Sequence, residues 1–188
     1  MQLEVIVACD LNGAIGRNGA IPWHIREDIM RFQSITVGPN ATEKKNVVIM
    51  GRKTWYSIPP LQRPLSHRNN IVVTSDPNNV AVISNKGAWS GSVHTAASFD
   101  DALKLAQSLS PSSTVYVIGG QRLYEEAILD PRTQRVHLTL VNMHAADCDA
   151  FFPLTVAYQQ FPNVDILSTT SIYSFITMSR NSDATTRK

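Results

Sequence analysis

The sequence predicts one α/β domain, with a mostly parallel central β-sheet flanked by helices. Apolar runs of strand length recur at residues 5–9, 46–50, 71–74 and 115–118, and such runs are typical of strands covered on both faces. Stretches with helical spacing alternate with these runs, as expected when helices connect parallel strands. No repeat or linker divides the chain, so we expect one domain over residues 1–180 and a polar tail over 181–188.

Composition excludes several classes of function. The 188 residues are 43% apolar and 17% charged, and a net charge of +2 is too small for a nucleic-acid surface. Only Cys9 and Cys148 occur, so neither a disulfide framework nor a metal site is expected. No apolar run could span a membrane and no signal peptide precedes the first strand pattern, which predicts a cytoplasmic protein. Nothing visible requires a partner chain, so we expect a monomer.

The first predicted strand leads into a long loop over residues 10–22. Gly13, Gly16 and Gly19 give this loop several permissive backbone positions. Loops of this length inside a compact domain are usually functional and often act as lids. We therefore expect this loop to border a site.

A helix is predicted next, because an apolar stripe recurs at helical spacing through Ile25, Ile29, Phe32 and Ile35. Asp28 falls on that stripe, whereas Glu27 and Arg31 are predicted to project toward solvent. A carboxylate among apolar groups resists ionisation, and such a group facing a cavity is a candidate for ligand binding or acid–base chemistry. A helix N-cap or a hydrogen-bonded core aspartate is the alternative interpretation.

Two of the predicted strands are followed directly by glycine and a helix. Residues 46–50 lead into Gly51-Arg52-Lys53-Thr54, and residues 115–118 lead through Gly119-Gly120 into a helix over 121–129. Free N–H groups at helix starts attract anions, and parallel strands end at one edge of a sheet. The two junctions therefore indicate a site for an elongated phosphate-bearing ligand. Neither has Gly-x-Gly-x-x-Gly spacing, so a standard dinucleotide-binding fold is not indicated.

The remaining elements are predicted from local sequence pattern alone. A capping box at Ser98 opens a helix over 99–109, and strands are predicted at 135–142, which contains Thr139, and at 172–178. Residues 76–93 are predicted to be loop with a short strand near 81–83, and residues 143–153 are predicted to be loop.

The chain resembles the dihydrofolate reductase family from about residue 5 to residue 178. The motifs that carry the resemblance are Gly13-Ala14-Ile15-Gly16-Arg17-Asn18-Gly19, Ile21-Pro22-Trp23, Val48-Ile49-Met50-Gly51-Arg52-Lys53-Thr54-Trp55, Ser57-Ile58-Pro59, Arg63-Pro64-Leu65, Ile118-Gly119-Gly120 with Tyr124, and Asp149-Ala150-Phe151-Phe152-Pro153. Each motif alone is weak, but their order and spacing together are very specific.

The resemblance implies NADPH-dependent reduction of 7,8-dihydrofolate to tetrahydrofolate, with hydride passing from nicotinamide C4 to pterin C6. Asp28 would accept two hydrogen bonds from the pterin 2-amino group and N3. Thr139 would support that carboxylate, and Trp23 would hold the water that delivers a proton to N5.

The resemblance also implies the rest of the site. Arg68 would bind the α-carboxylate of the glutamate tail, and a cis Gly119–Gly120 bond and a cis Pro64 are expected. The folate cleft would be formed by Ile6, Val7, Ile21, Ile29, Phe32, Ser57, Ile58, Leu65, Ile118 and Tyr124. The cofactor would contact Ala8, Ile15, Gly19, Ala20, Gly51, Arg52, Lys53, Thr54, Val73, Thr74, Ser75, Ile118, Gly119, Gly120, Gln121, Arg122 and Leu123.

Three positions depart from the family pattern. Asp28 stands where animal members have Glu, although bacterial members use Asp, and Ile29 stands where Phe is common. With Ser75 and Ala97 near the expected adenosine 2′-phosphate, Arg52 and the Thr74 and Ser75 hydroxyls would discriminate NADPH from NADH. The alternatives to dihydrofolate reduction are an NADPH-dependent reductase of a pyrimidine or pterin intermediate and a non-catalytic ligand-binding homologue.

Overall fold

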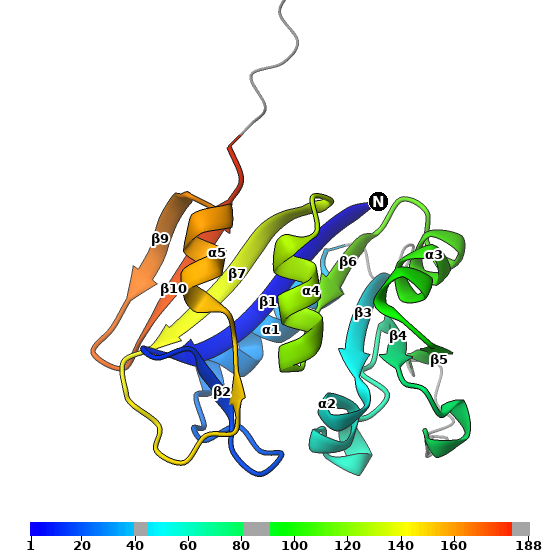
Figure 1. Ribbon diagram of the computed structural model, residues 1–188, viewed down its shortest axis with the longest axis horizontal. Helices are drawn as coiled ribbons and strands as arrows, with labels where there is room; N and C mark the ends of the chain where they lie inside the picture. The colour runs from blue at the N-terminus through cyan, green and yellow to red at the C-terminus, as the bar shows by residue number, and fades with distance from the viewer. Residues whose placement is uncertain (40–44, 81–90, 182–188) are drawn as a thin grey trace, which may run out of the picture.

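An eight-stranded β-sheet runs through the centre of the molecule (Figure 1). The computed structural model describes residues 1–39, 45–80 and 91–181. The strands of this sheet are β1 (Gln2–Asp10), β3 (Asn46–Gly51), β4 (Arg68–Val73), β5 (Ser92–Ala96), β6 (Thr114–Val117), β7 (Thr133–Val141), β9 (Asn163–Thr169) and β10 (Tyr173–Ser179).

The strand order is β5-β4-β3-β6-β1-β7-β10-β9. The first six strands in this order pair in parallel, and β10 pairs antiparallel with both β7 and β9. Because crossover helices join parallel strands and cover both faces, the inner strands contain continuous apolar runs such as residues 47–50 and 115–117. The predicted fold class, a mostly parallel sheet flanked by helices, is confirmed.

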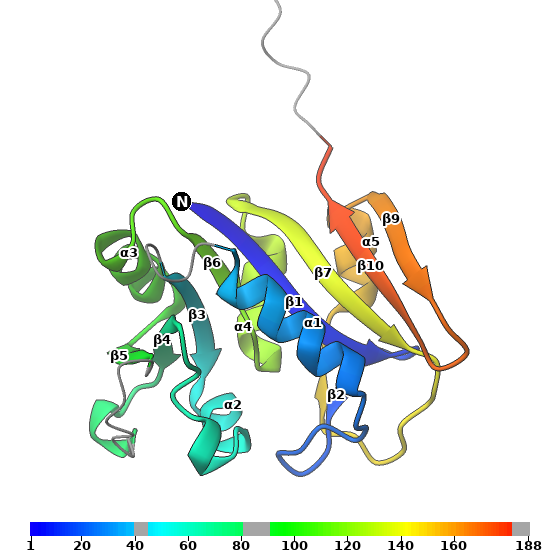
Figure 2. The same ribbon diagram turned by 180° about the vertical axis from the view of Figure 1, so that it is seen from behind.

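Helices cover the two faces of the sheet, as the opposite views in Figures 1 and 2 show. On one face, α3 (Phe99–Leu109), α4 (Gln121–Leu129) and α5 (Leu154–Gln160) pack on the larger apolar core. On the other face, α1 (Arg26–Val37) and the short α2 (Arg52–Ser57) pack on a second core around Ile6, Val48 and Tyr116. The pleat of β1 divides its residues between the cores, with Val5 and Val7 in the first and Ile6 in the second.

Most predicted elements are present, but several short or edge elements were missed. Short turns of 3₁₀ helix at Pro60–Gln62 and Pro77–Asn79 flank β4, and β2 (Ala14–Gly16) pairs with β8 (Ala150–Phe151) within the predicted loops. Strand β5 lies where loop was expected, and α5 and β9 had no prediction. All seven residues of β9 are exposed, so its sequence lacks the alternation that a half-buried strand shows. The strand expected near 81–83 lies outside the described residues.

The sheet brings the two glycine junctions together. The Gly51 N–H donates to Gly119 O at 2.7 Å, and the Ile118 N–H donates to Ile49 O at 2.9 Å, which extends the β3–β6 pairing to the strand ends. Gly51 is the N-cap of α2 and Gly120 is the N-cap of α4. The expected cis bonds are present at Arg63–Pro64 and Gly119–Gly120.

No helix in the described ranges is long and apolar enough to cross a bilayer. Within those same ranges, His, Cys, Asp and Glu side chains form no group able to hold a metal ion.

Candidate active site

Asp28 lies on the face of α1 that packs against the sheet. Thr139 of β7 is fully buried, and its hydroxyl donates to Asp28 Oδ1 at 2.7 Å. The N-cap of α1 is Ile25, so Asp28 does not cap the helix. Burial raises the pKa of the Asp28 carboxyl, while the hydrogen bond from Thr139 and the positive charge of Arg31 oppose that rise. The carboxylate is therefore held at a fixed point at an energetic cost.

Arg31 does not project toward solvent, so that prediction was wrong. Its guanidinium reaches across β7 and β10, donating to Thr139 Oγ1 and to Ile176 O, both at 3.3 Å. The guanidinium carbon lies 4.8 Å from the centre of the Phe175 ring. The helix turns about 100° per residue, so position 31 lies close to the stripe that Asp28 and Phe32 occupy. The long side chain then follows the apolar surface to polar partners.

Trp23 lies just before α1 and packs with Ile25, Val141 and Tyr173 in a small third core. Its indole N–H is buried and has no hydrogen-bond partner among the groups of the described residues. A buried donor without a protein partner is costly, so it favours a bound polar species. The water-binding role expected of Trp23 requires such a donor, although the buried Trp55 Nε1 and Arg63 Nε lack partners within the described ranges in the same way.

The side chains expected to form the walls of the folate cleft differ in their exposure to solvent. Ile21 is 62% exposed and Ile29 is 51% exposed, so both side chains are accessible to a ligand. Phe32, Ile58, Leu65 and Ile118 are partly buried against the core that contains Ile6. Val7 points into the opposite core, so only its backbone is available to the cleft.

Tyr124 and Ser57 have polar contacts inside the protein. The Tyr124 ring is buried and its hydroxyl donates to Ile6 O at 3.0 Å, so it supports the cleft wall from behind rather than forming an edge. The exposed Ser57 hydroxyl donates to Thr54 O at 2.8 Å.

Arg68 is a buried cation at the start of β4. It is 4% exposed, and it donates from Nη1 to Thr36 Oγ1 at 2.7 Å and from Nε to Ser66 O at 2.9 Å. Its guanidinium lies 5.7 Å from the centre of the Phe32 ring, and burial lowers its pKa to about 10. Neutral acceptors do not neutralise a buried charge, so the site favours an anionic ligand.

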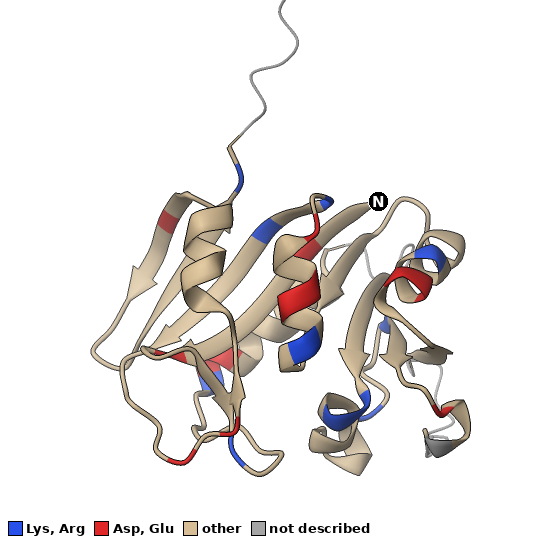
Figure 3. Cartoon of the chain, in the orientation of Figure 1, with Lys and Arg blue, Asp and Glu red and all other residues tan. Residues whose placement is uncertain are grey.

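The helix starts at Gly51 and Gly120 form a tight cradle. A Cβ atom at Gly120 would lie 3.3 Å from Thr54 Oγ1, and one at Gly119 would lie 3.3 Å from the Tyr124 ring. Arg52 and Lys53 are exposed beside this cradle, and the basic start of α2 is blue in Figure 3. Small residues, helix N-termini and cations together fit a phosphate group.

The start of α4 supplies the other side of the cradle. Gln121 accepts from the Phe151 N–H at 2.9 Å, Arg122 pairs with Glu126 at 3.0 Å, and the Leu123 side chain is buried. The Gln121 and Leu123 side chains are therefore occupied within the protein. The backbone N–H groups at the start of α4 and the exposed Arg122 side chain remain accessible to a ligand.

Residues 73–75 follow β4 toward the same edge. Val73 is half-buried and Ser75 is exposed. The Thr74 side chain is buried, and its hydroxyl accepts from the Asp76 N–H at 3.1 Å and lies 3.2 Å from Asp76 O. That hydroxyl is already occupied, so Ser75 is better placed than Thr74 to contact a ligand phosphate.

The loop expected to act as a lid is pinned at its base by Asp10, which sequence reasoning missed. This buried carboxylate accepts from the N–H groups of Asn12, Ala14 and Ala145, each at 2.8 Å. An aspartate directly after a strand and before a glycine is the available sequence signal, because its side chain often bonds the backbone two residues on. Ala8 and Ile15 are half-buried near this base, and Gly19 and Ala20 are exposed in the loop.

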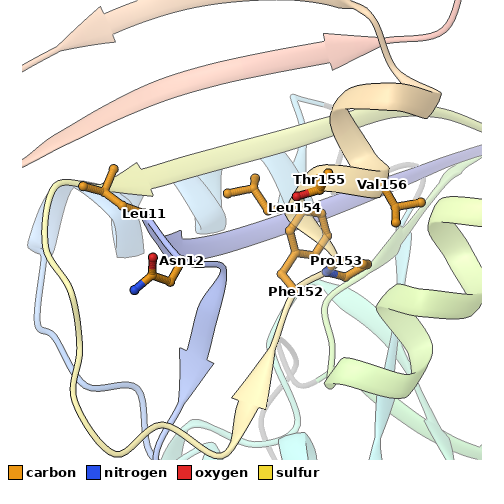
Figure 4. Close-up of a pocket in the computed structure, with 7 residues that line it drawn as sticks. All are labelled: Leu11, Asn12, Phe152, Pro153, Leu154, Thr155 and Val156. Atoms are coloured by element: carbon orange, nitrogen blue, oxygen red, sulfur yellow. The ribbon is translucent and has the colours of Figure 1, made fainter.

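A separate cavity of about 430 Å³ lies where β1 ends and α5 begins (Figure 4). Its lining contains none of the predicted site residues. The lining residues are Leu11, Asn12, Phe152, Pro153, Leu154, Thr155 and Val156.

The fold and the site define the class of protein. It is an α/β protein with two features of a ligand-binding site: a carboxylate among apolar side chains between α1 and the sheet, and a cradle suited to an anionic group at the ends of β3 and β6.

Comparison with known proteins gives the family. Residues 2–173 match the family described as dihydrofolate reductase. The dihydrofolate reductase of Aedes albopictus is 34% identical over 168 residues, which covers 87% of this chain and 86% of that protein. The enzymes of Heliothis virescens and Rattus norvegicus are 36% and 39% identical, covering 88% and 80% of this chain and 85% and 78% of theirs. The chain therefore belongs to the dihydrofolate reductase family.

As a member of this family, it is an oxidoreductase that reduces dihydrofolate to tetrahydrofolate with a nicotinamide cofactor.

Proposed function

We propose that the chain carries out this reduction with NADPH, and that Asp28 holds the pterin while Trp23 and Thr139 support it. The observation that carries the proposal is the hydrogen bond from Thr139 to Asp28, which fixes a carboxylate on an otherwise apolar helix face. A fixed carboxylate matches two parallel N–H donors, such as a ring N–H beside an exocyclic amine. The pterin 2-amino group and N3 are such a pair.

In this proposal the protein positions the substrate and controls a proton. The exposed Ile21 and Ile29 side chains cover the pterin and limit access of bulk water. Trp23 holds a water with its buried indole N–H, and that water brings the proton to pterin N5. Arg68 binds the α-carboxylate of the glutamate tail and so fixes the far end of the substrate.

The cofactor fits the cradle at Gly51 and Gly120. When bound, it supplies the hydride that reaches pterin C6. Arg52, Lys53 and Thr54, with the backbone from Gly119 to Leu123, hold its phosphates. Arg52 and Ser75 together favour the 2′-phosphate of NADPH over the free hydroxyl of NADH.

We also propose that residues 1–180 form the working domain, and that the enzyme acts as a cytosolic monomer. The ordered sheet supports the domain limit because β10 ends at Ser179.

The proposed function is tested by following the loss of the reduced-cofactor absorbance when dihydrofolate is added. We expect turnover with NADPH, a higher Michaelis constant with NADH, and inhibition by a 2,4-diaminopyrimidine folate analogue. Equal use of the two cofactors would contradict the NADPH preference. Turnover of an aminopyrimidine but not of dihydrofolate would contradict the substrate assignment.

A further inference from the structure

Arg31 contacts the residue that holds Asp28. Its Nη1 donates to Thr139 Oγ1 at 3.3 Å, and the same hydroxyl donates to Asp28 Oδ1 at 2.7 Å. Its Nη2 donates to Ile176 O at 3.3 Å, and the guanidinium stacks 4.8 Å from the centre of the Phe175 ring. Contacts with two strands therefore fix one guanidinium beside the carboxylate.

Helix spacing and strand register produce this arrangement. Asp28 and Arg31 are three residues apart on α1, so their side chains emerge on neighbouring parts of one face. Phe175 of β10 is the direct cross-strand partner of Thr139 of β7, so the ring lies beside the hydroxyl. The cation thus has an aromatic face beneath it and an acceptor at each end.

Other charged groups near this face already have partners or remain neutral. Glu4 of β1 pairs with His137 at 2.7 Å and with Arg135 at 3.1 Å. The Tyr124 hydroxyl of α4 donates to Ile6 O, and burial raises its pKa, so it stays uncharged. Arg26 and Glu27 on α1 are exposed. Among the residues that the structure describes, Arg31 is therefore the cation that acts on Asp28.

We propose that Arg31 is a positioning residue for the reaction, which fixes the Thr139 hydroxyl and keeps the Asp28 carboxylate ionised and aimed at the pterin. The inference rests on the proposed role of Asp28. Arg31 acts through Asp28 and Thr139 and does not touch the reacting atoms.

The physical basis is a balance of opposing effects on Asp28. Burial raises the pKa of its carboxyl, whereas the Thr139 hydrogen bond and the Arg31 charge lower it. Without the charge, Asp28 takes up its proton at a higher pH. A protonated carboxyl no longer accepts two hydrogen bonds with full charge, so it holds the pterin less well.

The test compares Arg31→Gln, which removes the charge but keeps an N–H donor, with Arg31→Lys, which keeps the charge. Arg26→Gln is the matched control, because it makes the same charge change at an exposed position of α1. The pH of Asp28 ionisation is read by ¹³C NMR of aspartate-labelled protein, with the signal assigned by its absence in Asp28→Asn. The second readout is kcat/KM for dihydrofolate across pH.

We expect Asp28 to ionise at a higher pH in Arg31→Gln. On the acid side of the profile, kcat/KM should fall by about ten-fold, which is the loss produced when the ionisation of the carboxyl moves about one pH unit higher. Arg31→Lys keeps the charge but replaces the two-nitrogen guanidinium with a single ammonium group, so both readouts should lie closer to the wild type than those of Arg31→Gln. Arg26→Gln should change neither readout. In an Asp28→Asn background, Arg31→Gln should add almost no further loss, because both changes act on one unit.

An unmoved Asp28 ionisation in Arg31→Gln would overturn the inference, as would an equal loss of kcat/KM in the Asp28→Asn background. If Arg31→Gln does not fold, Arg31→Met replaces it, since a Met side chain can still cover the Phe175 ring. Full activity of Asp28→Asn would overturn the proposed role of Asp28 together with this inference. If kcat/KM falls in Asp28→Asn but not in Arg31→Gln, this inference alone is overturned.

Discussion

Asp28, the residue proposed to bind the pterin, also carries an energetic cost in the folded protein. Its carboxyl is shielded from water, so its pKa is raised despite the opposing effects of Thr139 and Arg31. A group whose folded-state pKa exceeds its unfolded value destabilises the folded state as pH rises through the folded pKa. Such costs are typical of functional sites, where residues are selected for chemistry rather than for stability.

Asp28→Asn should therefore raise the melting temperature of the ligand-free protein near neutral pH. Asn keeps an oxygen that can accept from Thr139 but has no charge to desolvate. The advantage should vanish in acid, below the ordinary aspartate pKa, where the wild-type carboxyl is protonated in both states. Calorimetry across pH checks this, with roughly 2–4 °C expected for each kcal/mol at this chain length. A lower melting temperature for the variant at neutral pH would show that the carboxylate is stabilising instead.

Arg52→Ala should raise the Michaelis constant for NADPH much more than that for NADH. Arg52 is exposed at the first turn of α2, where it can reach a phosphate without repacking the core. Losing one charge-assisted hydrogen bond costs about 1.5–3 kcal/mol, or roughly ten- to hundred-fold. Steady-state kinetics with both cofactors measure this, and Arg132→Ala is a control far from the cradle. Equal increases for the two cofactors would place recognition of the 2′-phosphate elsewhere.

At the scale of elements, the loop over residues 10–22 is attached to a distant segment of the chain. The Gly13 carbonyl accepts from the Phe152 N–H at 2.7 Å, and the Gly16 carbonyl accepts from the Asp149 N–H at 3.0 Å. With Asp10, these bonds fix the base of the loop, whereas Gly19 at its tip is exposed. A fixed base with a free tip is the arrangement expected of a hinged lid.

Gly13→Ala should destabilise the protein more than Gly19→Ala. Both glycines have positive φ, 82° and 78°, so the backbone strain of an added side chain is similar. A Cβ at Gly13 would lie only 2.7 Å from Phe152 O, whereas nothing lies within 4 Å of one at Gly19. We expect about 1–3 kcal/mol from strain in each variant and a further loss in Gly13→Ala. Urea unfolding measures the difference, and equal losses would show that the loop base yields readily.

At the scale of the whole molecule, Arg180 directly follows β10 and joins the end of this last strand to β7, α4 and α5. It donates to Thr133 O at 2.9 Å and to Ile128 O, Asp130 O and Gln160 Oε1 at 3.0 Å. Its guanidinium also lies 4.5 Å from the centre of the Phe161 ring. This one side chain therefore binds β10, α4, β7 and α5 together.

Arg180→Met should lower the free energy of unfolding by about 2–4 kcal/mol, because the partly buried carbonyl groups of Thr133, Ile128 and Asp130 lose their donor. Lys104→Met is the control, since the Lys104 side chain is 79% exposed and its pair with Asp101 is a surface ion pair. Chemical denaturation of both variants measures the contrast. A larger loss in the control would contradict a central role for Arg180.

The sequence predicted the parts of the molecule that follow from local pattern. Buried parallel strands, glycine junctions and the position of Asp28 on an apolar stripe all leave direct signals. The course of Arg31 could not be predicted, because its partners Thr139 and Ile176 lie more than 100 residues away. Strand β9 was missed because pairing at an edge needs only one neighbour and no buried face.

The central claim is that the carboxylate of Asp28 holds the pterin during reduction. Its most direct test is the pH dependence of kcat/KM for dihydrofolate in Asp28→Asn, measured with a folded sample verified by its melting curve. We predict near-complete loss of turnover near neutral pH and partial recovery in acid, where the substrate arrives already protonated. Wild-type turnover of the variant at neutral pH would contradict it.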